Sequence, residues 1–415
     1  MVWVTWRAAM QEALYGSRGF YARGEPPAAH FRTSVHASPR YAAALLALLR
    51  EIDVSLGHPA RLDLVDIGAG RGELLSQMLG LARRGPLSGG QLPGAPPAGY
   101  PSLAERISPH AVEITPRPDG LDAQIRWSRS VPSRITGLVI ANEWLDTIPL
   151  DVAELTSDGP RLVLVNTATG AERPGPPASG GDRAWLRQWW PLRSIGDRAE
   201  IGSARCAAWA DVIGKLAGGL AVGVDYGHVR AGRPAGGTLA GYRDGRPVRP
   251  IPDGSCDITA HVAMDACAVA PASTGTGATG TATGTGATGA AQTTVTTQRV
   301  ALRALGLRGS RPSLGQAGHD PQGYLAALRR AAEESELTDP SGLGGFSWLV
   351  HAVRVPLPAC LTLGGHTLGG HTLGGDTLGG RAVPGGLMPA GRAIDAFAPA
   401  VDGRSATPLE RWADG

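Results

Sequence analysis

Runs of branched apolar residues alternate along the chain with segments of helical periodicity. Such runs predict buried strands, most of them followed by polar residues, at 62–67, 135–141, 220–228 and 346–353. Apolar positions three and four residues apart predict helices over 40–50, 298–309 and 321–334. Strands that alternate with helices indicate an α/β fold, with helices on both faces of a parallel sheet.

The strand at 62–67 runs into a glycine-rich loop. Gly68, Gly70 and Gly72 lie in the stretch Asp66-Ile67-Gly68-Ala69-Gly70-Arg71-Gly72-Glu73, and a helical segment follows. Glycines allow turns with positive φ and the close approach of a ligand, and the N–H groups at the start of the helix face that ligand. We therefore expect a nucleotide-like cofactor at this loop. A tight turn without a ligand is the alternative.

The residues that flank the loop indicate which cofactor binds. A dinucleotide-binding loop has a third small residue where this chain has Glu73. Asp66 suits a ligand with an ammonium group better than one with a pyrophosphate. S-adenosylmethionine (SAM) has an ammonium and a carboxylate on its methionyl end and no phosphate. We therefore expect SAM to be bound by Asp66, Gly68, Gly70 and Gly72.

Two further strand ends carry polar residues, and the carboxyl ends of parallel strands are where ligands bind in open α/β sheets. Glu113 ends a predicted strand, and its carboxylate can accept hydrogen bonds from both ribose hydroxyls. Asn142, Glu143 and Asp146 follow the next buried strand. We expect these residues beside the methyl-bearing end of the cofactor.

Composition argues against several other classes of protein. The chain has 415 residues and a net charge of only +3, which does not favour a nucleic-acid partner. The 4 cysteines show no C-x-x-C spacing, so neither a metal site nor a disulfide framework is expected. The sequence has neither a signal peptide nor an apolar run close to the ~20 residues of a membrane span. These features predict a cytoplasmic protein.

Low-complexity stretches interrupt the predicted fold. Residues 81–103, 272–291 and a pentad repeat at 361–380 are expected to be flexible or disordered, and 174–181 is predicted to be a linker. The resulting predicted domains are an N-terminal helical lid segment (1–60), a cofactor-binding half (61–150), an inserted lobe with a hairpin and tryptophan-rich helices (151–217), the rest of the sheet (218–271 and 295–357), a low-complexity linker (272–294) and a tail (358–415).

The motifs occur in an order that resembles a known family. They are Tyr15-Gly16 with Gly19-Phe20-Tyr21, Thr33-Ser34 with Ser38-Pro39, the glycine loop, Val112-Glu113-Ile114-Thr115-Pro116, Asn142-Glu143-Trp144-Leu145-Asp146-Thr147-Ile148-Pro149, Asp225-Tyr226-Gly227-His228, Asp257-Ile258-Thr259-Ala260-His261-Val262 and Leu337-Thr338-Asp339-Pro340. From about residue 15 to 355 the chain resembles the MidA family of class I SAM-dependent methyltransferases, whose mitochondrial members are protein arginine methyltransferases that assist assembly of respiratory complex I. The resemblance implies a Rossmann-like sheet with an inserted substrate lobe.

The resemblance also implies roles for individual residues. A guanidinium acceptor is cationic, and carboxylates orient it and share its charge. We assign that role to Glu143 and Asp146, with Asn142 as a positioning amide. An acid at the start of a helix is the alternative for Asp146. The substrate-side residues are Asp225, Tyr226, His228, Thr33 and Ser34; for the first three a structural hydrogen-bond network is the alternative.

The sequence also departs from the family pattern. Val35-His36 stands where the family often has Pro-Glu, and the segment 127–130 has no acid to face adenine. The main hypothesis is a methyltransferase that acts on a protein side chain, with arginine favoured. One alternative is a SAM-binding assembly factor that works by contact without catalysis. The other is a nicotinamide-dependent oxidoreductase, which Glu73 disfavours.

Overall fold

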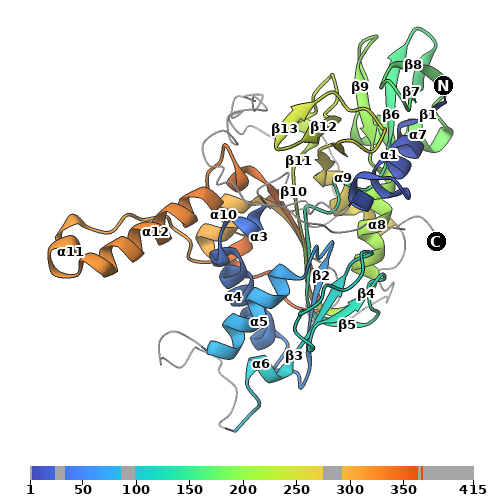
Figure 1. Cartoon of the computed structure of the whole chain (residues 1–415). Helices are drawn as coiled ribbons and strands as arrows, with labels where there is room; N and C mark the ends of the chain where they lie inside the picture. Colours follow the sequence, from blue (N-terminus) through green and yellow to red (C-terminus); the bar gives the residue numbers. More distant parts are fainter. Residues whose placement is uncertain (1, 24–32, 86–98, 274–291, 363–365, 368–415) are drawn as a thin grey trace.

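The computed structural model describes residues 2–23, 33–85, 99–273, 292–362 and 366–367 (Figure 1). Most of the predicted low-complexity stretches, at 81–103, 272–291 and 361–380, and the whole of the remaining tail, lie outside the described residues. Within the described part, no helix is long and apolar enough to cross a membrane.

A large mixed sheet forms the centre of the fold. Its strands, in spatial order, are β18 (His366–Thr367), β16 (Gln292–Thr297), β17 (Ser347–Val353), β10 (Leu216–Asp225), β5 (Ile135–Asn142), β2 (Leu62–Ile67), β3 (Ile107–Val112) and β4 (Arg126–Ser128). The five from β10 to β4 are parallel, whereas β17 runs antiparallel to β10. The predicted strands are therefore confirmed, but the sheet is mixed rather than wholly parallel.

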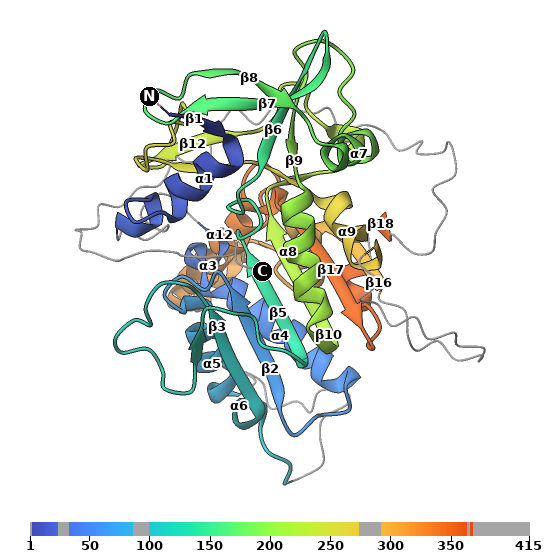
Figure 2. The ribbon, with the colours of Figure 1, turned by 90° about the vertical axis from the view of Figure 1, so that its right-hand side faces the viewer.

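Helices cover both faces of this sheet, as Figures 1 and 2 show. One face packs against α4 (Pro39–Ser55) and α5 (Glu73–Arg84), and the other against α8 (Ser203–Gly214) and α9 (Met264–Ser273). Successive strand residues point to opposite faces. Leu138 and Ile140 of β5 accordingly belong to the first core, and Val139 and Ala141 to the second.

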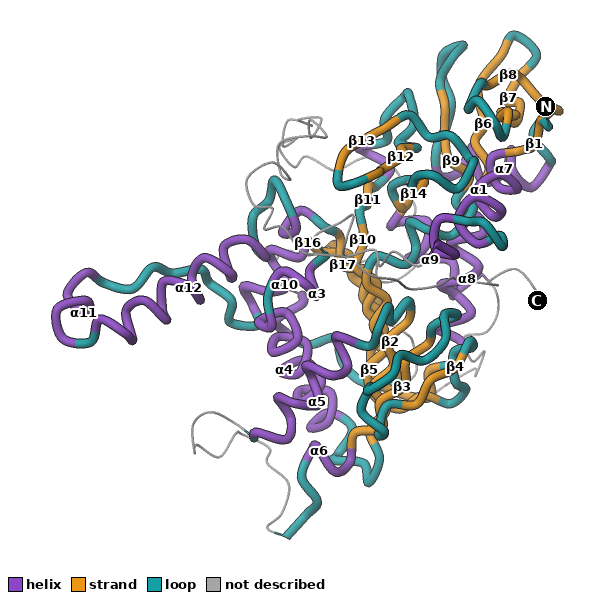
Figure 3. The backbone as a smooth tube through the Cα atoms, viewed as in Figure 1, coloured by secondary structure: helices purple, strands orange, loops and turns teal. Residues whose placement is uncertain are grey.

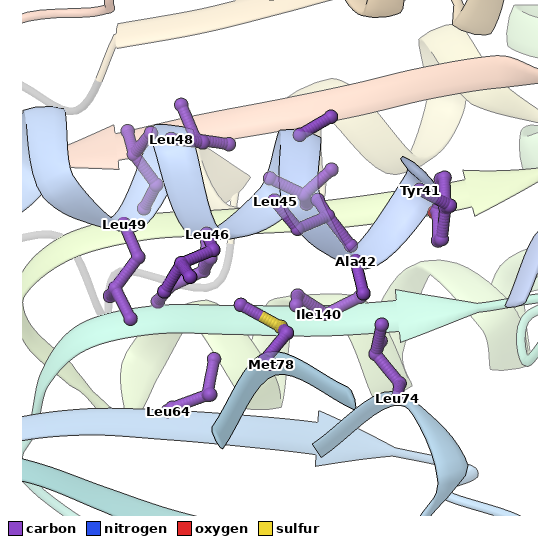
Figure 4. Packing of buried hydrophobic residues seen from close by; sticks show 14 of the residues in the cluster. Tyr41, Ala42, Leu45, Leu46, Leu48, Leu49, Leu64, Leu74, Met78 and Ile140 are labelled. Carbon is purple, nitrogen blue, oxygen red and sulfur yellow. The ribbon is translucent and has the colours of Figure 1, made fainter. Parts of the chain in front are cut away.

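The core beneath α4 explains why this helix forms where it does. Ser38 caps it, since its hydroxyl accepts a hydrogen bond from the Arg40 N–H (3.0 Å) and Pro39 follows in the first turn. Figure 4 shows side chains of α4 and α5 meeting Leu64 and Ile140 of the sheet. Full burial of each leucine or isoleucine contributes about 1.5–3 kcal/mol.

The strand order creates a topological switch point. From β2 the chain continues to β3 and β4 on one side of the sheet, and then returns to β5 and β10 on the other side. Ligands bind in the crevice at the carboxyl ends of the strands where the order reverses. By this rule the expected ligand crevice lies between the carboxyl ends of β2 and β5.

A second, antiparallel sheet lies beyond one end of the large sheet (Figure 1). Its strands are β1 (Trp3–Thr5), β6 (Asp151–Thr156), β7 (Gly159–Asn166), β8 (Glu172–Pro177) and β9 (Arg198–Ile201). The predicted hairpin is confirmed, because Thr156 pairs with Gly159. The predicted linker at 174–181 is wrong: it contains part of β8, which pairs with β7, and the start of α7 (Gly180–Trp189). Proline's fixed φ is compatible with an edge strand, so its presence does not exclude a strand there.

Shorter elements complete the described chain. They are α1 (Trp6–Tyr15), η1 (Phe20–Arg23), α3 (Ser34–Ala37), α6 (Leu103–Arg106), β11 (Gly227–His228), η2 (Arg230–Gly232), β12 (Ala240–Arg243), β13 (Arg246–Val248), β14 (Asp257–Thr259), β15 (Val262–Ala263), α10 (Gln298–Ala304), α11 (Leu314–His319), α12 (Pro321–Leu337), η3 (Leu343–Gly345) and α13 (Ala359–Thr362). Figure 3 shows α12, with α11, extending away from the sheet.

A buried ion pair joins α4 to the start of β3. Both guanidinium ends of Arg106 contact the Asp53 carboxylate at 2.6 Å, and the His58 ring contacts it at 2.9 Å. Burial raises the pKa of Asp53, but the hydrogen bonds from Arg106 and His58 outweigh it, so the pKa lies below its ordinary value. The pair therefore anchors the end of the sheet opposite the crevice.

Candidate functional site

The glycine loop connects β2 to α5 at the expected ligand crevice. Gly68, Gly70 and Gly72 all have positive φ, at 71°, 57° and 81°. Side chains disfavour this conformation, which explains glycine at these positions. At Gly72 space is also short, since an added Cβ would lie 2.9 Å from Leu121 Cδ1. The loop thus presents bare backbone toward the crevice.

Asp66 lies near the end of β2, beside this loop, and is 4% exposed. Among the described residues none donates a hydrogen bond to its carboxylate. Burial raises the pKa of Asp66 well above its usual range, and the nearby charges of Glu73 and Glu113 raise it further. A buried carboxylate in this state gains most from a cation, and the ammonium of the expected cofactor is such a group.

Glu113 follows β3 and holds the glycine loop in place. Its Oε2 accepts the Gly70 N–H at 3.0 Å, and its Oε1 accepts the N–H groups of Ile114 and Thr115 at 2.7 and 3.1 Å. These hydrogen bonds lower the pKa of Glu113, but burial outweighs them and the pKa lies above its ordinary value. A carboxylate offers about four acceptor positions. One remains on Oε2, so a second ribose hydroxyl binds only if a backbone donor gives way.

Asn142 and Glu143 are linked at the end of β5. Tyr41 of α4 donates to Asn142 Oδ1 at 2.7 Å, and Asn142 Nδ2 donates to Glu143 Oε1 at 2.9 Å. Glu143 has a positive φ of 53°, and its N–H donates to the Val224 carbonyl at 2.7 Å. This left-handed conformation is costly for a residue with a side chain, and it comes directly after the last residue of β5.

The surroundings of Glu143 keep its proton bound near neutral pH. Burial raises the pKa of Glu143 to about 8, and the charge of Asp146 adds to this. The Asn142 amide, which donates to Oε1, and the backbone N–H of Ser34 act in the opposite direction. A carboxyl group with a pKa near neutrality can both give and take a proton.

Asp146 lies in a turn after β5, 6% exposed, so the alternative of an acid at a helix start is wrong. Its Oδ2 accepts the Thr259 hydroxyl at 2.6 Å, whereas its Oδ1 has no partner among the described residues. Its N–H donates to Asp225 Oδ2 at 3.0 Å. The guanidinium of Arg205 lies nearby but donates to backbone carbonyls, including those of Asp146 and Ala260.

The carboxyl groups around Asp146 repel one another. Burial raises the pKa of Asp146, and it raises that of Asp225 well above its usual range. Burial and Asp146 raise the pKa of Asp257 to about 7, and the Tyr21 hydroxyl donates to its Oδ1 at 3.3 Å. Such a group of carboxyl groups has room for an added positive charge, which would relieve the repulsion.

Aromatic rings border this group on the exposed side. Tyr226 is 38% exposed, and its ring lies 5.9 Å from that of His261 and 4.1 Å from that of Phe346. The His228 Nδ1 contacts Arg233 at 2.6 Å, and its Nε2 has no partner in the described part of the chain. Burial and Arg233 lower the pKa of His228 to about 3, so the ring is neutral. Aromatic faces of this kind attract cations.

The predicted lid residues flank the crevice at α3. Thr33 Oγ1 contacts His36 Nδ1 at 2.7 Å, and His36 Nε2 lies 3.6 Å from Glu73 Oε1. Ser34 is fully buried, and its hydroxyl pairs with Gln298 rather than facing the crevice.

The structure brings together the strand-end residues named from the sequence and adds others. Tyr41, Asp257, Thr259 and Gln298 contact them but were not identified as site residues. Tyr41 had a detectable signal, because it is a hydroxyl-bearing residue on the apolar face of a predicted helix. The remaining contacts join segments far apart in sequence, which periodicity does not detect.

Comparisons with known proteins give independent information about the family and the fold of this chain. A family model described as "Putative S-adenosyl-L-methionine-dependent methyltransferase" matches residues 45–281. A methyltransferase candidate from Burkholderia thailandensis, solved with S-adenosyl-homocysteine, is 21% identical with a TM-score of 0.67, covering 88% of this chain and 92% of that chain. An uncharacterized protein of the same superfamily and organism is 21% identical, with a TM-score of 0.66. The match covers 88% of this chain and 91% of that chain. No curated protein matches the sequence. At this identity the solved structures show the fold alone.

Proposed function

Because the chain belongs to this family of S-adenosyl-L-methionine-dependent methyltransferases, we propose that it methylates a protein side chain, with the arginine guanidinium favoured as acceptor. The order of its motifs supports a closer relation to the MidA family. The observation that carries the proposal is the unpartnered, buried Oδ1 of Asp146 within a group of carboxyl groups whose pKa values are raised. A cationic acceptor adds to the single positive charge that Arg205 brings to these carboxyl groups.

The residues at the glycine loop fit SAM. Asp66 has a buried carboxylate without a hydrogen-bond donor among the described residues, and we assign it to the methionyl ammonium. Gly68 and Gly70 adopt positive φ and carry no Cβ, and we assign this backbone to the rest of the methionyl group. Glu113 retains one acceptor position for a ribose hydroxyl. When bound, SAM supplies a methyl group already activated on a sulfonium.

The acceptor side performs positioning and proton handling. Glu143 and Asp146 orient the guanidinium and share its charge, and Asn142 fixes the orientation of Glu143 through its 2.9 Å hydrogen bond. The acceptor nitrogen gains a methyl group and loses a proton, so the product keeps the single positive charge of the reactant. We place that proton on Glu143, whose pKa of about 8 suits it to the task.

The test measures transfer and SAM binding separately. The protein is incubated with SAM labelled on the methyl group and with cell lysate, and proteins are hydrolysed and analysed for labelled methylarginine. The double variant Glu143→Gln/Asp146→Asn should lose the label and keep SAM affinity. The control Asp158→Asn changes an exposed acid in the hairpin turn and should retain both.

Each other outcome has a defined meaning. Label on another amino acid would exclude arginine but keep the methyltransferase. SAM binding without any labelled protein would favour the assembly factor that acts by contact. Transfer that persists in the double variant would refute the roles given to Glu143 and Asp146. The nicotinamide-dependent alternative is not retained, since the family is SAM-dependent.

A further inference from the structure

Two of the 4 cysteines lie side by side in the core on one face of the large sheet. The Sγ atoms of Cys206 in α8 and Cys267 in α9 are 3.6 Å apart, although the residues are 61 positions apart in sequence. Both thiols are free. Figure 2 shows the two helices on the same face of the sheet. A disulfide bond is about 2.05 Å long, so the two sulfur atoms need to approach by only about 1.5 Å to form one.

The contact between the two thiols makes them unequal in reactivity. The hydrogen bond from the Cys267 thiol lowers the pKa of Cys206, against the effect of burial. The same hydrogen bond and burial raise the pKa of Cys267 well above its usual range. Cys206 is also the more exposed of the two, at 8% against 1%. Because the thiolate is the nucleophilic form, Cys206 is the sulfur that an oxidant reaches first.

The other two cysteines lack such a partner among their described contacts. The Cys256 Sγ is 3.6 Å from the Ile251 carbonyl, and burial raises its pKa. The Cys360 Sγ is 3.7 Å from the Glu51 carboxylate, and burial and this negative charge raise the pKa of Cys360 to about 12. Cys360 is nevertheless the most exposed of the 4. Exposure alone would therefore select Cys360 for oxidation, whereas thiolate character and pairing select Cys206.

The residue next to Cys206 connects the pair to the acceptor side of the site. Arg205 is 1% exposed, and its guanidinium donates to the backbone carbonyls of Asp146 and Ala260. Its positive charge lowers the pKa values of Asp146 and Asp225, against the effect of burial. A movement of this part of α8 therefore also moves the cation that faces these carboxyl groups.

A residue close to Cys267 makes a second connection. Asp265 lies two positions before Cys267 and accepts a hydrogen bond from the Arg233 guanidinium. Arg233 in turn contacts His228 Nδ1 at 2.6 Å. Each of the two sulfur atoms is therefore within two residues of a side chain that reaches toward the candidate site.

We propose that Cys206 and Cys267 form a modification site, at which a peroxide converts the two thiols into a reversible disulfide bond between α8 and α9. The Cys206 sulfur attacks one oxygen of hydrogen peroxide, the O–O bond breaks, and a sulfenic acid and one water molecule form. The Cys267 sulfur then attacks the sulfenic sulfur, the S–O bond breaks, and a second water molecule leaves. The two thiols together lose two electrons and two protons, and the peroxide takes up both.

The experiment maps the bond in the whole protein after exposure to hydrogen peroxide. Remaining thiols are alkylated under denaturing conditions, and the chain is digested without reductant. Trypsin together with a protease that cleaves before aspartate separates Cys256 from Cys267, because Asp257 and Asp265 lie between them. We expect a cross-linked peptide pair that contains Cys206 and Cys267 and has lost two hydrogen atoms, and dithiothreitol should abolish it.

The other cysteines supply the controls. Cys256 and Cys360 should stay alkylated while the bond forms, and Cys360→Ser should form it at the parent rate. Cys206→Ser and Cys267→Ser should each abolish it. A pair that stays alkylated after peroxide treatment, or a Cys360 that is oxidised before the pair, would overturn the proposal. Because the mapping uses the parent protein, it decides the question even where a variant fails to fold.

The effect on transfer rests on the proposed function and has its own readout. The disulfide draws α8 and α9 together and displaces Arg205, so the rate of methyl transfer should fall by about ten- to a hundredfold, with SAM affinity unchanged. Dithiothreitol should restore the rate, and Cys267→Ser should show no peroxide-induced disulfide. If the reduced protein transfers no methyl group, the proposed function fails while the mapping still tests the modification site. A bond that forms without a change in rate would refute the link through Arg205.

Discussion

Replacing Asp66 by asparagine tests the cofactor assignment at one atom. The substitution keeps the size and removes the charge of a carboxylate that is 4% exposed, and no described residue donates a hydrogen bond to it. A hydrogen bond between charged groups contributes about 1.5–3 kcal/mol. Its loss therefore predicts SAM binding that is weaker by about ten- to a hundredfold.

Calorimetric titration with two ligands makes this test specific. SAM carries the methionyl ammonium, whereas methylthioadenosine lacks the whole amino-acid part. Asp66→Asn should weaken only the first ligand. Asp63→Asn changes an acid on the same strand that contacts Arg61 and the Thr136 N–H, and it should weaken neither. Equal losses for both ligands, or SAM affinity within twofold of the parent, would refute the assignment.

The same substitution should stabilise the protein without cofactor. Burial raises the folded-state pKa of Asp66 above its unfolded value, so the folded state binds the proton more tightly. The stability that this group contributes is present below the unfolded pKa of about 3.9 and is lost as the pH rises through the folded pKa. Asp66→Asn removes that loss, so the melting temperature of the variant protein at neutral pH should be higher than that of the parent. A lower melting temperature would show that the weaker binding reflects local unfolding.

Three further outcomes are expected elsewhere in the chain. Arg106→Met leaves Asp53 buried without its main partner and should cost about 3–5 kcal/mol in urea denaturation while SAM affinity is kept; a cost below ~1 kcal/mol would contradict the role of the pair. Gly72→Ala should lower the free energy of unfolding by about 1–2 kcal/mol, because φ is 81° and the new Cβ would meet Leu121; an unchanged melting curve would argue against this loop geometry. The single-turnover rate of methyl transfer should rise by up to tenfold per pH unit between about pH 6 and pH 8, because Glu143 loses its proton over this range. A rate that does not depend on pH would exclude Glu143 as the proton acceptor.

The strands and the sheet edge of the site were accessible from sequence because they depend on local pattern. Branched apolar runs end at Asp66, before Glu113 and before Asn142, and the parallel register places these ends together. Tertiary contacts were not accessible in the same way. The Ser34 hydroxyl is a plausible substrate contact in sequence, but a glutamine 264 positions away occupies it. Periodicity reports which face is buried, and not which polar group the burial brings into contact.

Two local conformations could also not be predicted from the sequence pattern. The prolines at 174–177 suggested a linker, yet this segment pairs with β7 as an edge strand. Glu143 adopts a left-handed conformation that residues other than glycine rarely take, and its N–H bond to Val224 of β10 stabilises it. In both cases long-range pairing overrides the local preference.

The prolines of β8 also limit how another chain can approach the protein. Pro174, Pro176 and Pro177 lack an N–H, and they make up half of a six-residue strand at the edge of the second sheet. An incoming peptide that adds as an extra strand needs a row of donors and acceptors, and this edge cannot offer it. A protein that docks on this edge must therefore bind through its side chains. The same prolines also oppose the pairing of this edge with the sheet edge of a second copy of the protein.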